Sequence, residues 1–492
     1  MKDLLSLLET NDSLDPVNWE EMKGLAHEMV EDMFAYLKPC VEQSVWKAIP
    51  EEIKTTFEQP LPSLPESPLS VYQKFKDTIL PYSKGNIHPR FWGWAIGTGS
   101  PFGMMAEMLA GGLNPDICMG AHAPMYVEEQ VINWLKVFMG FPSDAGGTLV
   151  SGTSMANLTG LLAARNNCHE QRIREEGLCG LTQKGLVMYA SSEVHSCIKK
   201  AAEVMGIGRS ALRLIKVDQR YRMISEELTK RIEQDRADGY EPFCVVATVG
   251  SVNTGAIDPL DEIREVCNRF KLWMHIDGAF GALARNVPEY KEELKTMQLA
   301  NSLAFDLHKW FSVPMGCGCV IVKDKTAFRN SFSLQSNYLV QFKEGVAAGP
   351  DPTFNYGIEM TKPFRALKVW MTVREHGIEH HTAIIRRNIA QAFYLQQLVQ
   401  QEATLEMVTP VILNIVCFRY IYGEFELERL NQINQDILLK IQNSGIAVLS
   451  HTMLNEQFVL RAAMLNHRTQ KADLHFLIKL VIEFGQQAIN GT

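Results

Sequence analysis

Several features that place proteins in specialised classes are missing from this 492-residue sequence. Its ten cysteines are scattered without a Cys-x-x-Cys pair, which argues against a disulfide framework and favours a reducing compartment. No apolar run reaches the roughly 18–20 residues of a membrane span. The start, MKDLLSLLETNDSLDP, is acidic where a signal peptide is basic and then apolar. We therefore expect a cytoplasmic protein without a membrane partner.

Positive charge, repeats and metal-binding patterns are also scarce. The net charge is −8 at pH 7, which argues against a nucleic-acid partner. The segment Gly97–Gly103 looks like a dinucleotide-binding loop, but its spacing is wrong and Pro101 interrupts it. Cys317 and Cys319 have no further ligands nearby, so no metal site is predicted. At this length, two or three packed subregions are expected.

The middle of the chain alternates short apolar runs with helical patterns. Strands are expected at residues 186–190, 212–217, 243–249, 272–276, 302–305 and 319–322, and helices at 195–205, 225–238 and 259–270. Short buried strands separated by helices predict an α/β protein with a mainly parallel sheet covered on both faces. Ligands of such sheets bind at the carboxyl ends of the strands.

The two ends of the chain have different patterns. Residues 16–56 are amphipathic and helical, and the proline-rich residues 59–68 are expected to be extended. A long helix is expected at 364–398, followed by a small α+β region with strands at 411–420 and 457–464. The loop between Ser333 and Tyr356 contains glycines and prolines, which suggest a flexible lid.

Two residues at expected strand ends form the sharpest chemical signal. Asp277 ends the run Leu-Trp-Met-His-Ile-Asp and is followed by small residues, among them Ala279, which leave room for a flat ring. Lys309 follows the run Ser-Leu-Ala-Phe. Pyridoxal 5′-phosphate (PLP) requires a lysine that forms a Schiff base and an acid that keeps its pyridine nitrogen protonated. The pair therefore predicts a PLP site.

A hydroxyl-rich turn predicts an anion site. Thr153 and Ser154 lie between an apolar run and a helix, where their hydroxyls and free helix-start N–H groups can bind a phosphate. His195 also follows an expected strand and begins a helix, so it is a candidate for stacking on a ring or for acid–base chemistry.

Taken together, these motifs resemble the pyridoxal-dependent decarboxylases of the group that includes aromatic-L-amino-acid, glutamate and cysteine-sulfinate decarboxylases. The resemblance extends over nearly the whole chain. Its most specific parts are His275-Ile-Asp-Gly-Ala279 and Asp306-Leu-His-Lys-Trp310, together with the Ser-Gly-Thr-Ser turn, Glu193-Val-His195 and Ala247-Thr-Val-Gly-Ser-Val-Asn-Thr-Gly255.

The resemblance implies a role for each matching residue. Lys309 would carry the Schiff base, Asp277 would pair with the pyridine nitrogen, and His195 and Ala279 would contact the two faces of the ring. Either Thr248 or Ser251 would orient His195 or the phenolic oxygen of the cofactor. Three residues would hold the phosphate: Thr153, Ser154 and His308.

The resemblance also implies an architecture. The fold would be the PLP-dependent transferase type I fold, similar to that of aspartate aminotransferase, with a mainly parallel, seven-stranded type of sheet between helices. Residues 1–80 would form a helical segment that wraps the partner subunit of a homodimer. Residues 81–360 would form the large PLP-binding domain, and residues 361–492 the small C-terminal α+β domain.

Two departures from the family pattern stand out. Many relatives have asparagine at the position of Asp306, and an ionised aspartate cannot donate to phosphate, so we expect Asp306 to anchor the loop or a neighbouring N–H instead. Amine-forming relatives place a tyrosine in the mobile loop, near Thr353 or Phe354 of this chain. Tyr356 and Tyr338 are the candidate substitutes as proton donor, acting in either subunit's site.

The resemblance implies decarboxylation of an L-amino acid to the amine and carbon dioxide. Trp92, Trp94 and Ile96 match the segment that lines the side-chain pocket in relatives, and they favour an aromatic substrate. An acidic or small amino acid is the alternative, and so is an aldehyde synthase, which combines decarboxylation with oxidative deamination. A transaminase or a non-enzymatic binding protein fits the motifs less well.

Overall fold

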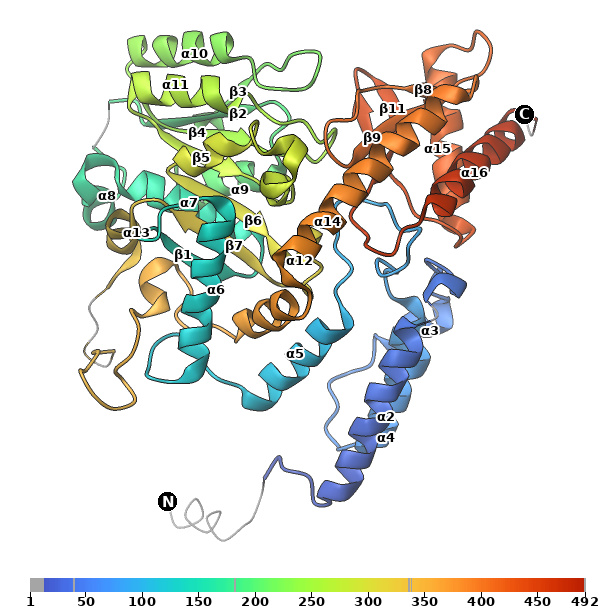
Figure 1. The fold of residues 1–492 in the computed structure, drawn as a ribbon, viewed down its shortest axis with the longest axis horizontal. Coiled ribbons are helices and arrows are strands. Elements are labelled where there is room, and N and C mark those ends of the chain that lie inside the picture. The colour runs from blue at the N-terminus through green and yellow to red at the C-terminus, as the bar shows by residue number, and fades with distance from the viewer. Residues whose placement is uncertain (1–12, 39, 181–182, 335–336, 338, 491–492) are drawn as a thin grey trace.

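The structure is a computed structural model that describes residues 13–490, except for residues 39, 181–182, 335–336 and 338. Figure 1 shows three parts: an N-terminal helical segment that extends from the body, a central sheet between helices, and a C-terminal sheet with its own helices. Among the described residues, none of the helices combines the length and apolar character that crossing a bilayer requires.

The central sheet has seven strands in the order β1-β7-β6-β5-β4-β2-β3. Only β7 runs antiparallel to its neighbours, so the predicted mainly parallel sheet is confirmed. The strand bounds are β1 (Gly146–Val150), β2 (Leu186–Ser191), β3 (Leu212–Ile215), β4 (Glu241–Thr248), β5 (Trp273–Asp277), β6 (Ser302–Asp306) and β7 (Gly318–Val322).

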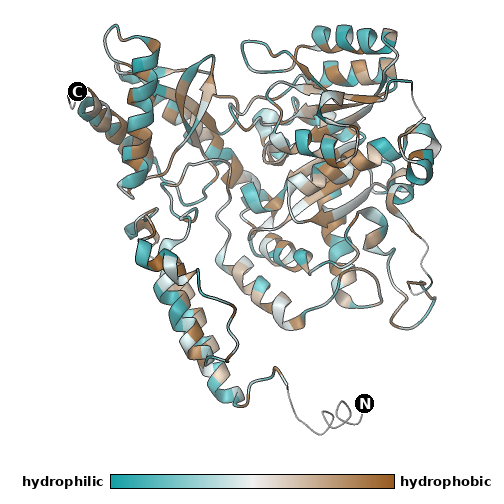
Figure 2. Cartoon of the chain, turned by 180° about the vertical axis from the view of Figure 1, so that it is seen from behind, coloured by the Kyte–Doolittle hydropathy of each residue, from teal (hydrophilic) through white to brown (hydrophobic). Residues whose placement is uncertain are grey.

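Alternate residues of the central strands belong to different hydrophobic clusters. In β4, Cys244 and Val246 pack with residues of α7 and α9, whereas Val245 and Ala247 pack with residues of α10 and α11. This two-residue period places helices on both faces of the sheet, and Figure 2 shows the hydrophobic strands between them. The bounds of these helices are α7 (Thr153–Asn166), α9 (Ser196–Val204), α10 (Ser225–Ala237) and α11 (Leu260–Phe270).

The parallel direction of the strands determines where the site lies. Strands β1, β2, β4, β5 and β6 all end at the same edge of the sheet. The residues at and after these ends are therefore neighbours in space, although Thr153 and Asp306, for example, are 153 positions apart in the sequence. The sequence predicted ligand binding at this edge.

The N-terminal segment consists of α2 (Trp19–Leu37), α3 (Glu51–Thr56) and α4 (Pro68–Lys74), so the helical pattern at 16–56 corresponds to two helices. Helix α2 lies along the segment that contains α4, because the Tyr72 hydroxyl donates to Asp32 at 2.7 Å and Lys76 pairs with Glu28 at 3.0 Å. The proline-rich residues between α3 and α4 are irregular, as predicted. Helix α2 buries none of its residues.

The C-terminal part begins with the long helix α14 (Arg365–Gln401), which is bent at Gly377 where φ is 71°. A four-stranded antiparallel sheet follows, in the order β10-β11-β9-β8. Strands β8 and β10 were not predicted. The remaining bounds are β8 (Leu405–Met407), β9 (Ile415–Tyr420), α15 (Leu427–Asn443), β10 (Ser450–Leu454), β11 (Gln457–Ala463) and α16 (Lys471–Asn490).

Several helices of the central part were also not predicted. Helix α5 has three glycines and apolar residues on all sides, so it lacks the single apolar stripe that marks an amphipathic helix. Ser100 caps its first turn by accepting from the Gly103 N–H. The helices of the central part that were not predicted are α5 (Pro101–Leu113), α6 (Ala123–Met139), α8 (Arg172–Glu176), α12 (Leu307–Trp310) and α13 (Lys325–Phe332). The described part of 333–352 contains neither helix nor strand.

Candidate active site

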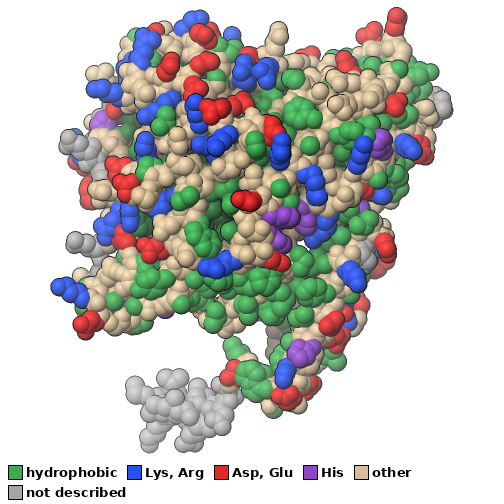
Figure 3. All heavy atoms as spheres, viewed as in Figure 1, with side chains coloured by type: hydrophobic (Ala, Val, Ile, Leu, Met, Phe, Trp, Pro, Cys, Tyr) green, Lys and Arg blue, Asp and Glu red, His purple; other side chains and the backbone are tan. Residues whose placement is uncertain are grey.

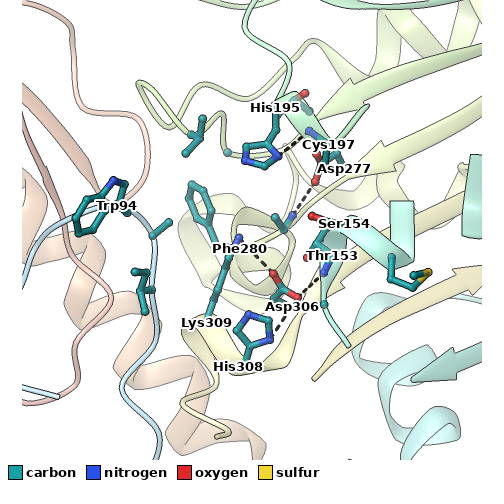
Figure 4. A pocket seen from close by; sticks show the side chains of 18 of the residues that line it. Trp94, Thr153, Ser154, His195, Cys197, Asp277, Phe280, Asp306, His308 and Lys309 are labelled. Carbon is teal, nitrogen blue, oxygen red and sulfur yellow. Dashed lines mark hydrogen bonds and ion pairs between the residues drawn. The ribbon is translucent and has the colours of Figure 1, made fainter. Parts of the chain in front are cut away.

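The shared strand ends surround one pocket of about 470 Å³, within the range of small-ligand sites. Figure 4 shows side chains from β5, from the turn after β6 and from the starts of α7 and α9 converging on it. Ten of the residues predicted from the sequence line this pocket: Trp94, Ile96, Thr153, Ser154, His195, Thr248, Asp277, Ala279, His308 and Lys309.

Lys309 lies on the single turn of helix α12 that follows β6. Its amino nitrogen is 3.3 Å from the nearer carboxylate oxygen of Asp306, and its side chain is 21% exposed. Asp306 is buried and accepts a hydrogen bond from the backbone N–H of Thr153 at 2.7 Å. The expectation that Asp306 anchors a neighbouring N–H is therefore confirmed. One buried carboxylate joins the lysine to the start of helix α7.

Asp277 and His195 face the same pocket from the ends of β5 and β2, between which β4 lies in the sheet. Burial raises the pKa of Asp277, whereas the charge of Lys309, a protonated form of His195 and the Ala279 N–H lower it. Burial lowers the pKa of His195, with Asp277 opposing this effect. The Nδ1 atom of His195 accepts from the Cys197 N–H at 3.2 Å, so a neutral His195 carries its proton on Nε2. The proton of His195 is thereby available to a ligand in the pocket.

The predicted phosphate site lies at the start of helix α7. Thr153 and Ser154 occupy its first turn, where N–H groups lack partners within the helix. His308 turns its Nδ1 atom toward the backbone of Cys317, at 3.0 Å from the carbonyl oxygen. Close packing surrounds this turn, since a Cβ atom added at Gly318 of β7 would lie 2.6 Å from the Gly152 backbone. The arrangement offers hydroxyl and N–H donors beside one imidazole.

The residues present fit PLP. The hydroxyl oxygens of Thr153 and Thr248 are buried, and neither has a hydrogen-bond partner within the described chain. Both residues line the pocket that also contains a lysine and a buried carboxylate. Unsatisfied buried hydroxyls are costly in a folded protein and are expected where a ligand completes the site. The donor set matches a ligand that has a phosphate, an aldehyde and a ring nitrogen.

Two residues of the predicted site lie elsewhere, which corrects the sequence prediction. Ser251 does not line the pocket, because its hydroxyl pairs with Thr254 at 2.9 Å within the turn after β4. Of the two alternatives, Thr248 therefore reaches the pocket. Trp92 is fully buried in the core of the C-terminal part, where its backbone N–H donates to the Val448 carbonyl at 2.8 Å. It cannot line a substrate pocket.

Tyr356, one of the two predicted proton donors, is not found in the pocket either. Tyr356 is buried, its hydroxyl donates to Asp351, and its ring packs 5.2 Å from that of Phe328. Tyr356 does not line the pocket that contains Lys309, so its assignment as donor within its own subunit's site is wrong. Tyr338 lies outside the described residues. Among the loop residues that the structure describes, no proton donor is therefore identified.

Several functional residues were missed by the sequence reasoning. Phe280 and Val252 add apolar surface to the pocket, and Cys197 lines it beside His195. Arg461 donates to the Trp94 carbonyl at 3.0 Å and so holds the backbone that carries Trp94. Burial lowers the pKa of Arg461 to about 10. An arginine inside the apolar run of β11 was the available signal for such a positioning role.

Comparisons with known proteins agree with this geometry. Residues 50–421 match the pyridoxal-dependent decarboxylase conserved domain. The chain is 30% identical to an aromatic-L-amino-acid decarboxylase of Bacillus atrophaeus, over 92% of this chain and 93% of that protein. It is 28% identical to a phenylacetaldehyde synthase of Arabidopsis thaliana, over 92% and 93% of the two chains.

A solved structure shares the fold. The crystal structure of Catharanthus roseus tryptophan decarboxylase in complex with L-tryptophan superposes with a TM-score of 0.86 at 25% identity, covering 96% of this chain and 100% of that one. The expected type I fold is thus confirmed. Given the matched domain, the fold and a pocket that fits PLP, the chain belongs to the pyridoxal-dependent decarboxylase family and is a PLP-dependent amino-acid decarboxylase.

Proposed function

We propose that this enzyme decarboxylates an aromatic L-amino acid to the corresponding amine. The observation that carries the proposal is the apolar wall of the pocket, formed by Trp94, Ile96, Val252 and Phe280. Flat, apolar surfaces of this kind bind an aromatic ring and give an acidic side chain no partner. Lys309 is the single lysine, and no arginine occurs, among the described residues that line the pocket.

The residues divide the work as follows. Bound PLP supplies an electron sink that stabilises the charge left when the carboxylate departs. Lys309 would hold the cofactor covalently, and Asp277 would keep a proton on the ring nitrogen. Thr153, Ser154 and His308 would bind the phosphate. His195, neutral and with its proton on Nε2, lines the same pocket and would support the ring. The apolar wall excludes water and orients the substrate.

The names of two relatives support the aromatic substrate. The Bacillus protein is an aromatic-L-amino-acid decarboxylase, and the Catharanthus structure contains L-tryptophan. Both align with more than nine-tenths of this chain. An acidic or small amino acid is the weaker alternative, because neither has a ring that could pack against the Trp94 and Phe280 side chains that line the pocket.

A second candidate product is an aldehyde. The loop position at which amine-forming relatives place a tyrosine falls near Thr353 or Phe354, and neither side chain is an acid. Thr353 donates to the Ile117 carbonyl, and Phe354 is buried. The Arabidopsis relative is a phenylacetaldehyde synthase. These observations favour oxidative deamination as the alternative outcome in this chain.

We also propose that the working unit is a homodimer in the cytoplasm. Helix α2 buries no residue, and Figure 3 shows hydrophobic side chains gathered over α5, beside the N-terminal helices. Trp19, Leu69 and Leu113 are each more than half exposed. Exposed apolar surface of this extent is expected to be covered, here by a second copy of the chain. All ten cysteines are free thiols, which suits a reducing compartment.

One assay tests the proposed reaction. The PLP-loaded enzyme is incubated with a panel of aromatic, acidic and small L-amino acids while carbon dioxide, amine, aldehyde and peroxide are measured together. We expect carbon dioxide and amine in equal amounts from an aromatic amino acid. Aldehyde and peroxide as main products would support the alternative, and turnover of acidic amino acids alone would contradict the substrate proposal. Sedimentation of the same preparation tests the dimer.

A further inference from the structure

Behind Asp277, a row of buried polar side chains connects three elements of the central part. The indole Nε1 of Trp273 donates to the Ser302 hydroxyl oxygen at 2.8 Å, and that oxygen lies 2.7 Å from Nδ1 of His275. The Nε2 atom of His275 lies 2.9 Å from the side-chain oxygen of Asn157. The side chain of Asn157 in turn lowers the pKa of Asp277 through a hydrogen bond. Ser302, His275 and Asn157 are completely buried.

The local structure leaves this row little freedom. Trp273 and His275 are alternate residues of β5 and point to the same face, and His275 is paired in register with Ser302 of β6. On the other side, a Cβ atom added at Gly160 of α7 would lie 2.7 Å from the His275 ring. The imidazole is therefore enclosed between the sheet and the helix, with both nitrogens engaged.

The direction of the hydrogen bonds follows from both ends of the row. An ionised Asp277 can only accept, so the amide nitrogen of Asn157 must face it, and the amide oxygen must face His275. Burial lowers the pKa of His275 to about 3, so the ring is neutral and carries one proton. Its Nε2 donates that proton to Asn157, and its Nδ1 is then an acceptor.

The Trp273 end of the row predicts the same direction for the hydrogen bonds. An indole N–H can only donate, so the Ser302 oxygen accepts from Trp273 and its own hydroxyl proton is free to point at Nδ1 of His275. The second amide hydrogen of Asn157 points at the sulfur of Cys197, at 3.3 Å. Every bond from Trp273 onward thus donates toward Asp277.

We propose that Trp273, Ser302, His275 and Asn157 form a positioning relay that keeps Asp277 ionised and oriented toward the ring nitrogen of the cofactor. Burial works against the charge of Asp277, and a donor held by a chain of polarised hydrogen bonds offsets that effect. Of the four side chains, only Asn157 is hydrogen-bonded to Asp277. Trp273, Ser302 and His275 therefore act on Asp277 through Asn157. The inference rests on the assignment of Asp277 to the ring nitrogen.

The test follows the ring nitrogen itself. PLP labelled with nitrogen-15 is bound to the full-length enzyme, and the chemical shift of its ring nitrogen is followed against pH. His275→Leu keeps the volume and removes both hydrogen bonds, whereas His275→Gln retains a donor toward Asn157. Asn157→Ala removes the last member. Asn166→Ala is the matched control, because Asn166 is buried on the same helix but donates to the Ser331 carbonyl.

We expect His275→Leu and Asn157→Ala to lower the pH at which the ring nitrogen loses its proton by about one to two units, the effect of one hydrogen bond to a charged group. His275→Gln should be intermediate, and Asn166→Ala should match the unmodified enzyme. Affinity for PLP should fall in the same order. Unchanged ring-nitrogen titration in both relay variants would overturn the proposal.

Two further variants separate the possible failures. If Asp277→Ala leaves the ring-nitrogen shift unchanged, the assignment of Asp277 is wrong. If Asp277→Ala moves it and the relay variants do not, the relay alone is wrong. Should His275→Leu fail to fold, Ser302→Ala decides, since it removes one oxygen atom and still deprives Nδ1 of its donor. It is expected to shift the titration in the same direction, and no shift would overturn the relay.

Discussion

The carboxylate of Asp306 lies 3.3 Å from the amino group of Lys309. The same carboxylate accepts a hydrogen bond from the backbone N–H of Thr153, the first residue of the helix at which we propose that phosphate binds. Asp306 thus adds negative charge at the proposed phosphate site, and it supplies a counter-ion beside the proposed reactive amine. Asparagine, which many relatives have at this position, would keep the hydrogen bond and lose the charge.

We predict that Asp306→Asn binds phosphate more tightly. Removing one negative charge close to a phosphate should raise the affinity of the cofactor-free protein for inorganic phosphate by about tenfold. Titration calorimetry measures this affinity. Asp235→Asn is the control, since Asp235 of α10 is buried in an ion pair with Arg213 of the edge strand β3. Equal or weaker phosphate binding by the Asp306 variant would show that its charge does not reach the site.

Trp94 and Trp92 provide a matched pair for the substrate pocket. Trp94 lines the pocket and is 47% exposed, whereas Trp92 is fully buried in the C-terminal core. Trp94→Ala should raise KM for an aromatic amino acid by about tenfold with little change in unfolding free energy. Trp92→Ala should lower the unfolding free energy by about 3–5 kcal/mol. Kinetics and urea unfolding of both variants check this, and an unchanged KM in the Trp94 variant would count against the pocket.

Tyr356→Phe should leave the ratio of amine to aldehyde unchanged. The hydroxyl of Tyr356 donates to Asp351 and lies outside the pocket, so its loss removes a structural hydrogen bond. The expected cost is about 1.5–3 kcal/mol of unfolding free energy, as for hydrogen bonds to charged groups. Quantifying both products from one substrate tests the prediction. A rise in aldehyde and peroxide would mean that Tyr356 protonates the substrate carbon in an assembled enzyme.

Acid should destabilise the protein through buried neutral histidines. Burial lowers the pKa of His275 to about 3 and that of His381 to about 4, from 6.5 in the unfolded chain. Below pH 6.5 the unfolded state therefore binds protons that the native state does not. The stabilisation is complete above pH 6.5 and is lost as pH falls toward 4, at about 1.4 kcal/mol per pH unit for each histidine.

His381→Gln should make the unfolding free energy depend less steeply on pH. Urea unfolding between pH 6 and 4.5 measures the slope, which should fall by about 1.4 kcal/mol per pH unit relative to the unmodified protein. His27→Gln is the control, because His27 is exposed on α2. Parallel slopes for His381→Gln and the unmodified protein would show that His381 is protonated in the native state.

The sequence predicted the central sheet well because its strands are buried on both faces and form short, nearly continuous apolar runs. Once the strands were located, the carboxyl-end rule placed Thr153, His195, Asp277 and Lys309 in one site, and the structure brings them together. The anchoring role of Asp306 was also predictable, because an ionised carboxylate can only accept.

Other features depend on tertiary contacts that local patterns do not contain. Trp92 and Trp94 are two positions apart, and a positive φ of 53° at Trp94 helps to direct one side chain to the core and the other to the pocket. In the sequence, Tyr356 was a candidate proton donor. In the structure, a hydrogen bond to Asp351 and packing against the Phe328 ring hold it outside the pocket. Strands β8 and β10 are short and half-polar, so they gave little signal.

The attachment of the cofactor to Lys309 is the central claim, and trapping it with borohydride tests it most directly. The PLP-loaded enzyme is reduced, digested and mapped by mass spectrometry, and its visible absorption is recorded before and after. We expect a yellow protein whose visible band disappears on reduction, with all the label on Lys309. Lys309→Ala should remain folded and take up no label, and Lys325→Ala, at an exposed position, should be labelled normally. Label on any other lysine in the unmodified enzyme would contradict the account.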